Sequence, residues 1–134
     1  MSKKFALGLV FLLASFFSSQ VWSQDSVQAT YYAKKFHRKK TASGEQYLKN
    51  AYTCAHKTLP FGTYLLVKNQ NNGNEVIVRV NDRMSSRSKS DIDLSYAAAA
   101  DLDMIVQGSN KVTISVLDSK AITARRDSLN DNKM

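Results

Sequence analysis

Two segments of alternating apolar residues, joined by an Asn-Gly turn, constrain the fold of this chain more than any other feature. Residues 63–69 read T-Y-L-L-V-K-N and residues 75–80 read E-V-I-V-R-V. Between them, N-Q-N-N-G-N contains Asn72-Gly73, a dipeptide that favours the tight turns of β-hairpins. Period-two alternation places successive side chains on opposite faces of a strand. The two segments therefore predict a hairpin with one buried face.

Shorter patterns predict further strands. Residues 29–33 and 51–55 are expected to form two short strands, and residues 111–117 a last strand with its branched apolar side chains on one face. The alanine-rich residues 95–104 predict one short helix. Mostly short strands with a single helix favour a small closed β-barrel, because closure removes exposed strand edges.

The ends of the predicted helix and of the chain carry different signals. Either Ser95 or Asp93 is suited to cap the first amides of the helix. After the last strand, residues 119–134 are polar and aperiodic, which predicts a flexible tail.

The N-terminus has the pattern of a cleavable secretory signal. Two lysines precede an apolar run over residues 5–17, which is too short to span a bilayer comfortably. Val21 and Ser23 occupy the positions that a signal peptidase reads, and an uncleaved amphipathic anchor is the less favoured alternative. No cysteine lies near the cut, so we expect no membrane anchor after cleavage. The predicted organisation is a signal peptide (1–23), a barrel domain (24–118) and a flexible C-terminal tail (119–134).

The basic charge of the chain indicates either an acidic partner or a role in solubility alone. The formal net charge is +8, and removal of Lys3 and Lys4 with the signal leaves +6. Export, and the absence of a basic stripe interleaved with aromatic residues, argue against nucleic acid. An acidic polymer such as cell-wall glycan fits better.

Cysteine and histidine usage exclude several kinds of site. Cys54 is the only cysteine, and its strand-like surroundings predict a small buried apolar residue rather than a nucleophile. His37 and His56 lack metal-ligand spacing. No glycine-rich phosphate loop or G-x-S-x-G motif is present. We therefore expect neither a metal nor a cofactor.

Three polar residues are candidates for chemistry. In V-I-V-R-V-N-D-R, residues 76–83, alternation puts Asp82 on the same face as the valines, at the rim of the barrel. A partly desolvated carboxyl can act as a general acid, but an Asn-Asp pair can also simply close a turn. His56 either polarises a reacting oxygen or is an ordinary polar residue at a strand end. Glu45, in a loop, is a second carboxylate that the fold could bring near Asp82. The residues alone leave these alternatives open.

Several motifs together resemble one family. They are Y-Y-A-K-K-F-H, K-T-A-S-G-E-Q-Y, A-Y-T-C-A-H-K-T-L-P-F-G-T, V-I-V-R-V-N-D-R and I-D-L-S-Y-A-A-A-A-D-L-D-M, in this order across residues 29–117. The chain resembles the RlpA-like (rare lipoprotein A) proteins, which are built on a double-psi β-barrel. The resemblance implies a mainly β fold: a six-stranded double-psi barrel with one short helix over about residues 95–104.

The resemblance also implies an activity. Active family members are lytic transglycosylases that cleave peptidoglycan glycan strands, preferably those lacking stem peptides. Carried over by motif, the catalytic residues are Asp82, His56 and Glu45. Asp82 would protonate the glycosidic oxygen and then accept the proton of the muramyl C6 hydroxyl, which closes a 1,6-anhydro ring. His56 would steady the acid or the sugar, and Glu45 would hold substrate or tune the pair.

The remaining expectations concern binding and location. The predicted substrate-binding residues are Tyr32, Phe36, Tyr47 and Arg83. The family's lipidated cysteine and C-terminal peptidoglycan-binding module have no counterpart in the sequence, so we expect a monomeric periplasmic or secreted protein. Met84 follows the N-D-R motif where the family has Gly-Pro. A non-catalytic barrel that grips glycan through basic and aromatic side chains is the alternative function.

Overall fold

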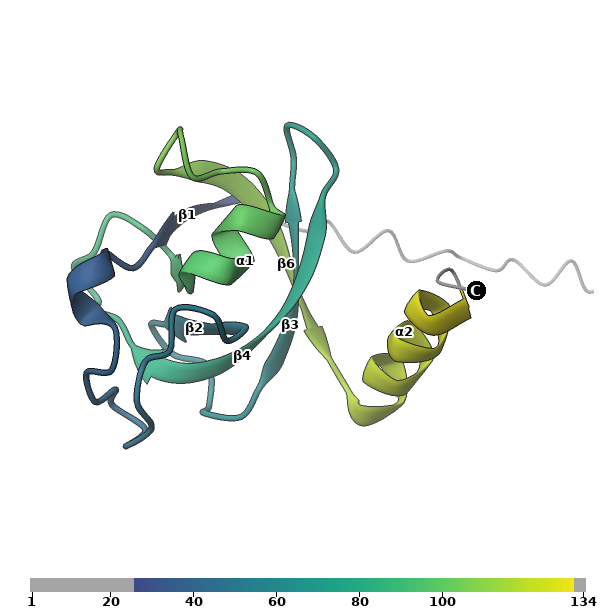
Figure 1. Cartoon of the computed structure of the whole chain (residues 1–134), viewed down its shortest axis with the longest axis horizontal. Helices are drawn as coiled ribbons and strands as arrows, with labels where there is room; N and C mark the ends of the chain where they lie inside the picture. Colours follow the sequence, from purple (N-terminus) through teal and green to yellow (C-terminus); the bar gives the residue numbers. More distant parts are fainter. Residues whose placement is uncertain (1–25, 132–134) are drawn as a thin grey trace, which may run out of the picture.

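The structure is a closed barrel of six short strands. The computed structural model describes residues 26–131, so the predicted signal peptide (1–23) lies outside the described residues. Neighbouring strands follow the order β1-β5-β2-β4-β3-β6, and β6 pairs with β1 to close the barrel (Figure 1). The elements are β1 (Ser26–Tyr31), the short 3₁₀ helix η1 (Lys34–Phe36), β2 (Thr53–His56), β3 (Tyr64–Asn69), β4 (Glu75–Arg83), β5 (Ile92–Leu94), α1 (Tyr96–Asp101), β6 (Asn110–Leu117) and α2 (Ser119–Asp131). The expected six-stranded barrel is confirmed.

The hairpin predicted from the Asn-Gly turn is β3 with β4. The two strands are antiparallel, and their register runs from Lys68 opposite Glu75 to Tyr64 opposite Arg79. Gly73 has a φ of 78°, a conformation that glycine adopts without the steric cost of a side chain. The local turn chemistry thus determines this pair.

Two other strand pairs are parallel and join distant segments. β1 pairs with β5, and β2 pairs with β4. β5 has three residues, too few to show a periodic pattern, and its strand character comes from its neighbours on both sides. The sequence patterns identified the other five strands but not β5.

The core fills the barrel from the alternate residues of its strands. Val76, Val78 and Val80 of β4 all point inward, as their spacing predicted. The buried cluster consists of Ala29, Cys54, Leu65, Val67, Val76, Val78, Val80, Ile92, Leu94, Ala98, Ala99, Leu102, Met104 and Val112. Burial raises the pKa of the Cys54 thiol to about 12, which fits the expected apolar role of this residue.

Helix α1 is shorter than the predicted 95–104 segment. Ser95 is the cap, since its hydroxyl accepts a hydrogen bond from the Ala98 amide, and Asp93 is not. Helical geometry ends at Leu102, and Asp103 has a φ of 53°, which turns the chain. The turn sends Leu102 and Met104 into the core, so burial rather than helix propensity sets this end.

The C-terminal segment differs from the expected loose tail, because residues 119–131 form helix α2. Asp118 accepts a hydrogen bond from the Ala121 amide at 2.7 Å and so caps the helix. Arg125 forms an ion pair with Glu75 of β4, which ties the helix to the barrel. α2 stands outside the barrel, beyond the end of β6 (Figure 1). No helix described within residues 26–131 has the length and apolar character needed to cross a bilayer.

Replacing Ser95 by alanine should lower the free energy of unfolding by about 1 kcal/mol, because the Ala98 amide loses its partner in a buried position. For a domain of this size we expect a fall in Tm of roughly 4–8 °C. Thermal unfolding followed by circular dichroism measures the change, and the exposed Ser86→Ala is the matched control. Equal Tm values for the two variants would contradict the capping role.

Candidate functional site

Four residues form a row across the outer face of the barrel. Thr30 of β1, Asp93 of β5, Ala55 of β2 and Asp82 of β4 lie opposite one another in register. In β5 both neighbours of Asp93 are fully buried in the core, so Asp93 itself points outward. The small side chain of Ala55 separates the two acids. Two carboxylates therefore share one face of four adjacent strands.

A β-bulge turns Asp82 onto this outer face. Cys54 pairs with Val80, but the next residue of β2, Ala55, pairs with Asp82, so Asn81 is an extra residue in β4. The extra residue reverses the alternation that follows it. The prediction that Asp82 shares the inner face with the valines is therefore wrong, because alternation alone does not reveal a bulge.

The Asp82 carboxylate is held by three hydrogen-bond donors. Oδ2 accepts a bond from the Tyr32 hydroxyl at 2.5 Å, and Oδ1 accepts bonds from the amides of Ala42 and Arg83, each at 2.8 Å. An ionised carboxylate is an acceptor only, so this set of donors matches it. Burial and the bond to Asp82 raise the pKa of Tyr32 well above its usual range, so its hydroxyl remains a donor.

Asp93 lies in a different environment. Burial raises the pKa of Asp93 to about 6, and the negative charge of Asp82 adds to this rise. The Thr30 hydroxyl, which donates to Asp93 Oδ1 at 3.2 Å, acts in the opposite direction. A carboxyl with a pKa near 6 is suited to give up a proton near neutral pH.

Sequence reasoning considered Asp93 only as a helix cap. In the sequence I-D-L-S, Asp93 stands between two apolar residues, and this alternation indicates that its side chain faces outward from a strand. Its position two strands away from Asp82 depends on pairings between distant segments.

Glu45 contacts Asn81, the residue next to Asp82, and is not itself part of the row. Its carboxylate forms a bidentate ion pair with Arg79, at 2.7 and 2.8 Å, and accepts a bond from the Asn81 amide group at 3.3 Å. The hydrogen bond from Arg79 lowers the pKa of Glu45, which therefore stays ionised. Glu45 thus contacts the bulge beside Asp82 rather than Asp82 itself.

His56 faces away from the row. Its Nδ1 accepts bonds from the Thr58 and Leu59 amides at 3.1 and 3.0 Å, which closes the turn after β2. Burial, and then the charge of Arg83, lower the pKa of His56, so the imidazole is neutral near pH 7. Among residues 26–131, no hydrogen bond joins His56 to Asp82. The two residues nevertheless lie close along the chain pairing, because Asp82 is opposite Ala55 and His56 is opposite Arg83 on the neighbouring strand.

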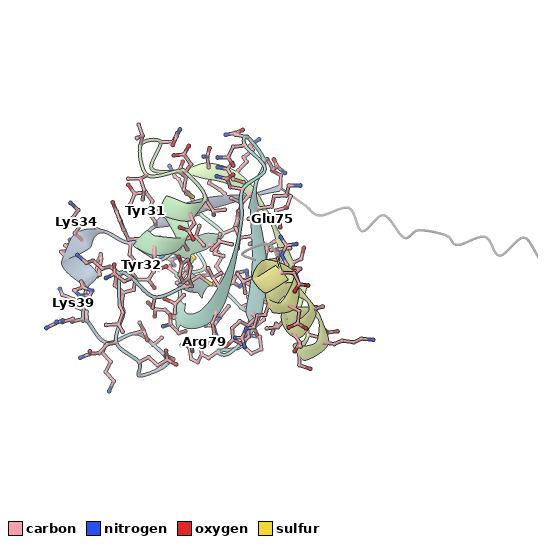
Figure 2. All side chains as sticks on the ribbon, turned by 45° about the vertical axis from the view of Figure 1, so that its right-hand side comes forward. Tyr31, Tyr32, Lys34, Lys39, Glu75 and Arg79 are labelled. Carbon is pink, nitrogen blue, oxygen red and sulfur yellow. The ribbon has the colours of Figure 1, made fainter. Side chains whose placement is uncertain are left out.

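Aromatic side chains build one wall of the site. The ring of Tyr32 stacks on Tyr47 with centroids 4.2 Å apart, and Phe36 packs edge-on against Tyr32. Tyr47 is only 2% exposed, so the expectation that it stacks on sugar is wrong: it supports Tyr32 from behind. Phe36 is 39% exposed and remains available to a ligand. Figure 2 shows Tyr32 closer to the barrel than the lysines at the outer edge of this segment.

Arg83 has its donors engaged within the protein. Its guanidinium donates to the carbonyl oxygens of His56 and Leu59, at 3.0 and 2.8 Å, and lies over the Phe61 ring. These contacts hold the turn after β2, so substrate binding by Arg83, which we predicted, would compete with them. Within residues 26–131, no cluster of three or more His, Cys, Asp or Glu side chains is arranged to hold a metal ion.

Sequence comparison assigns the family. Residues 24–114 match the family model described as lytic transglycolase, so the chain belongs to this family of double-psi β-barrels. It is 50% identical over 93 residues to the probable endolytic peptidoglycan transglycosylase RlpA of Treponema pallidum, covering 69% of this chain and 29% of that protein. The endolytic peptidoglycan transglycosylase RlpA of Campylobacter jejuni is 49% identical over 89 residues, covering 66% and 32%. The chain thus spans about a third of the length of these curated relatives.

Solved structures agree with the fold. Streptomyces papain inhibitor superposes with a TM-score of 0.55 at 26% identity, over 70% of this chain and 94% of that one. An expansin of Clavibacter michiganensis superposes with a TM-score of 0.58 at 18% identity, over 70% and 50% of the two chains. At that identity the expansin supports the barrel architecture alone.

The raised pKa of Asp93 makes stability depend on pH. The folded state binds the Asp93 proton more tightly than the unfolded state does. The resulting contribution to the free energy of unfolding is fully present below about pH 4 and is lost as pH rises through about 6. Asp93→Asn should therefore be more stable than the parent at pH 8, by on the order of 1–3 kcal/mol, and about equal to it at pH 4. Urea denaturation at both pH values measures this.

The exposed Asp127→Asn serves as the matched control, for which the difference from the parent should be small at both pH values. A difference for Asp93→Asn that is the same at pH 4 and pH 8 would show that Asp93 titrates as an ordinary carboxyl.

Proposed function

We propose that this barrel is a lytic transglycosylase that cleaves peptidoglycan glycan strands and leaves 1,6-anhydromuramyl ends. The observation that carries the proposal is the pair of outward-facing acids, Asp82 and Asp93, in unlike environments on one face of the barrel. Membership of the lytic transglycolase family, and the names of its relatives, support the same activity.

The different environments of Asp93 and Asp82 suggest which of them donates a proton and which accepts one. Asp93, protonated, donates its proton to the glycosidic oxygen as the bond to the muramyl C1 breaks. Asp82, ionised, accepts the proton of the C6 hydroxyl as that oxygen bonds to C1 and closes the anhydro ring. One proton is given and one is taken, so solvent exchange restores both acids. The general-acid role, first expected of Asp82, thus passes to Asp93.

The other candidates support these acids indirectly. Tyr32 orients the Asp82 carboxylate through its hydroxyl. Glu45, paired with Arg79, holds Asn81 and so maintains the bulge. His56 orders the turn at the end of β2, the strand between the two acids. We regard these three residues as positioning residues.

A substrate of the cell wall requires export. The proposal therefore includes the predicted signal peptide over residues 1–23 and a periplasmic or secreted location for the mature chain. It also includes glycan strands as the partner, a preference for strands without stem peptides, and action as a monomer.

Loss of either acid should abolish the reaction. Asp93→Asn and Asp82→Asn should each reduce release of anhydromuramyl products by about 10²-fold or more, the range that general acid-base catalysis contributes. Purified chain is incubated with amidase-treated glycan, and products are identified by mass spectrometry. Asp127→Asn, an exposed change on α2, should leave the rate unchanged.

Retained turnover in either folded variant would contradict the assigned roles. If the parent chain binds the glycan and releases no anhydro ends, the barrel is the alternative binding module.

The rate should fall as pH rises above about 6, because Asp93 must carry its proton to act as the acid. Thr30→Val removes a hydrogen bond that holds the pKa of Asp93 down, so the falling limb of the profile should move to higher pH. Initial rates measured between pH 4 and 9 test both statements. If Thr30→Val leaves the falling limb of the pH–rate profile at the same pH, that limb reports the titration of a group other than Asp93.

A further inference from the structure

A small pocket adjoins the site at Tyr32. It has a volume of about 190 Å³ and is lined by Tyr32, Lys34, Tyr47, Lys49, Asn50 and Tyr96. Pockets that hold whole small-molecule ligands are larger, roughly 300–1,000 Å³. A pocket of this size fits one substituent of a larger molecule.

The lining is rich in hydrogen-bond donors and contains no acid. Lys34, Lys49 and Asn50 line the pocket, and the side chain of each carries N–H donors. The ion pairs found among residues 26–131 involve Lys57, Arg79 and Arg125, and neither pocket lysine. A pocket lined by two lysines and no acid has a positive potential, which attracts an anion.

His37 links the two segments that carry these lysines. Its amide donates to the Lys34 carbonyl oxygen at 3.2 Å, and its Nδ1 accepts a bond from the Lys49 amide at 3.1 Å. The Lys49 carbonyl oxygen also accepts a bond from Ala97 at the start of α1. Both lysine backbones are thus fixed relative to the barrel. Figure 2 shows Lys34 and Tyr32 on the same side of the molecule.

We propose that Lys34 and Lys49 form a carboxylate-binding subsite that positions the glycan for cleavage, an inference that rests on the proposed function. Tyr32 borders the pocket and also donates to Asp82, so a substituent held there lies next to the row of acids. Peptidoglycan offers carboxylates of two origins: the lactyl group of a muramyl residue without its peptide, and the stem peptide itself. Charge-assisted hydrogen bonds from two lysines suit either one.

The test measures binding without cleavage. Soluble glycan fragments are titrated by calorimetry into the Asp93→Asn chain, with and without the double change Lys34→Gln and Lys49→Gln. Loss of two charge-assisted contacts should weaken Kd about 10-fold or more. The matched control, Lys68→Gln with Lys111→Gln, removes the same charge from exposed strand positions and should weaken Kd less than about 3-fold.

Three substrates identify the group that is bound: glycan stripped of peptides, glycan bearing stem peptides, and stripped glycan whose carboxylates are converted to methylamides. A loss of affinity confined to stripped strands assigns the subsite to the lactyl carboxylate. A loss confined to peptide-bearing strands assigns it to the peptide, and a loss with both shows that either carboxylate is accepted.

Three results would overturn the subsite: no loss with any unmodified glycan, an equal loss with the methylamide, or an equal loss in the control pair. Because the readout is affinity, it stays interpretable whether or not the parent chain cuts glycan. Failure of the proposed function appears separately, as the absence of anhydro ends.

Discussion

The site depends on a single extra residue in β4. Without the bulge at Asn81, alternation would direct Asp82 into the valine-lined interior, where a charge lacks partners. With it, the carboxylate emerges beside Ala55 and meets three donors from three segments of the chain. The Glu45–Arg79 pair lies over the bulge and holds Asn81 in place. Bulges of this kind commonly redirect a side chain next to an active site, and here one also marks where the core ends.

The two acids differ in their hydrogen-bond partners and in their surroundings. Asp82 is surrounded by donors, whereas Asp93 has one hydroxyl partner and lies between two fully buried neighbours. A stacked pair of tyrosines, with Tyr47 nearly inaccessible to solvent, shields the side of the site where Tyr32 meets Asp82. Shielding from water strengthens the electrostatic interactions on this side of the site. One face of a small domain therefore holds two carboxyl groups in unlike surroundings.

Local sequence patterns predicted the local parts of this structure. The Asn-Gly hairpin and the inward valines of β4 follow from patterns within a few residues and were predicted, and Ser95 was one of the two caps proposed for the helix. The pattern of short strands with one helix predicted a closed barrel, and the motif resemblance added its six-stranded double-psi form and a catalytic role for Asp82. Features made by distant pairings were missed: the strand character of β5, the outward turn of Asp82, and the place of Asp93 beside it. The burial of Tyr47 and the turn that engages His56 also depend on tertiary contacts, which residue type does not reveal.

The row that contains Ala55 also fixes the spacing of its two acids. Asp93 and Asp82 belong to strands on either side of β2, so their backbones are two strand spacings apart, on the order of 10 Å. Hydrogen bonds between main chains fix that interval, and substitution of surrounding side chains changes it little. The distance between the two acids is accordingly set by the sheet itself, and any sequence that folds with the same strand pairing keeps it.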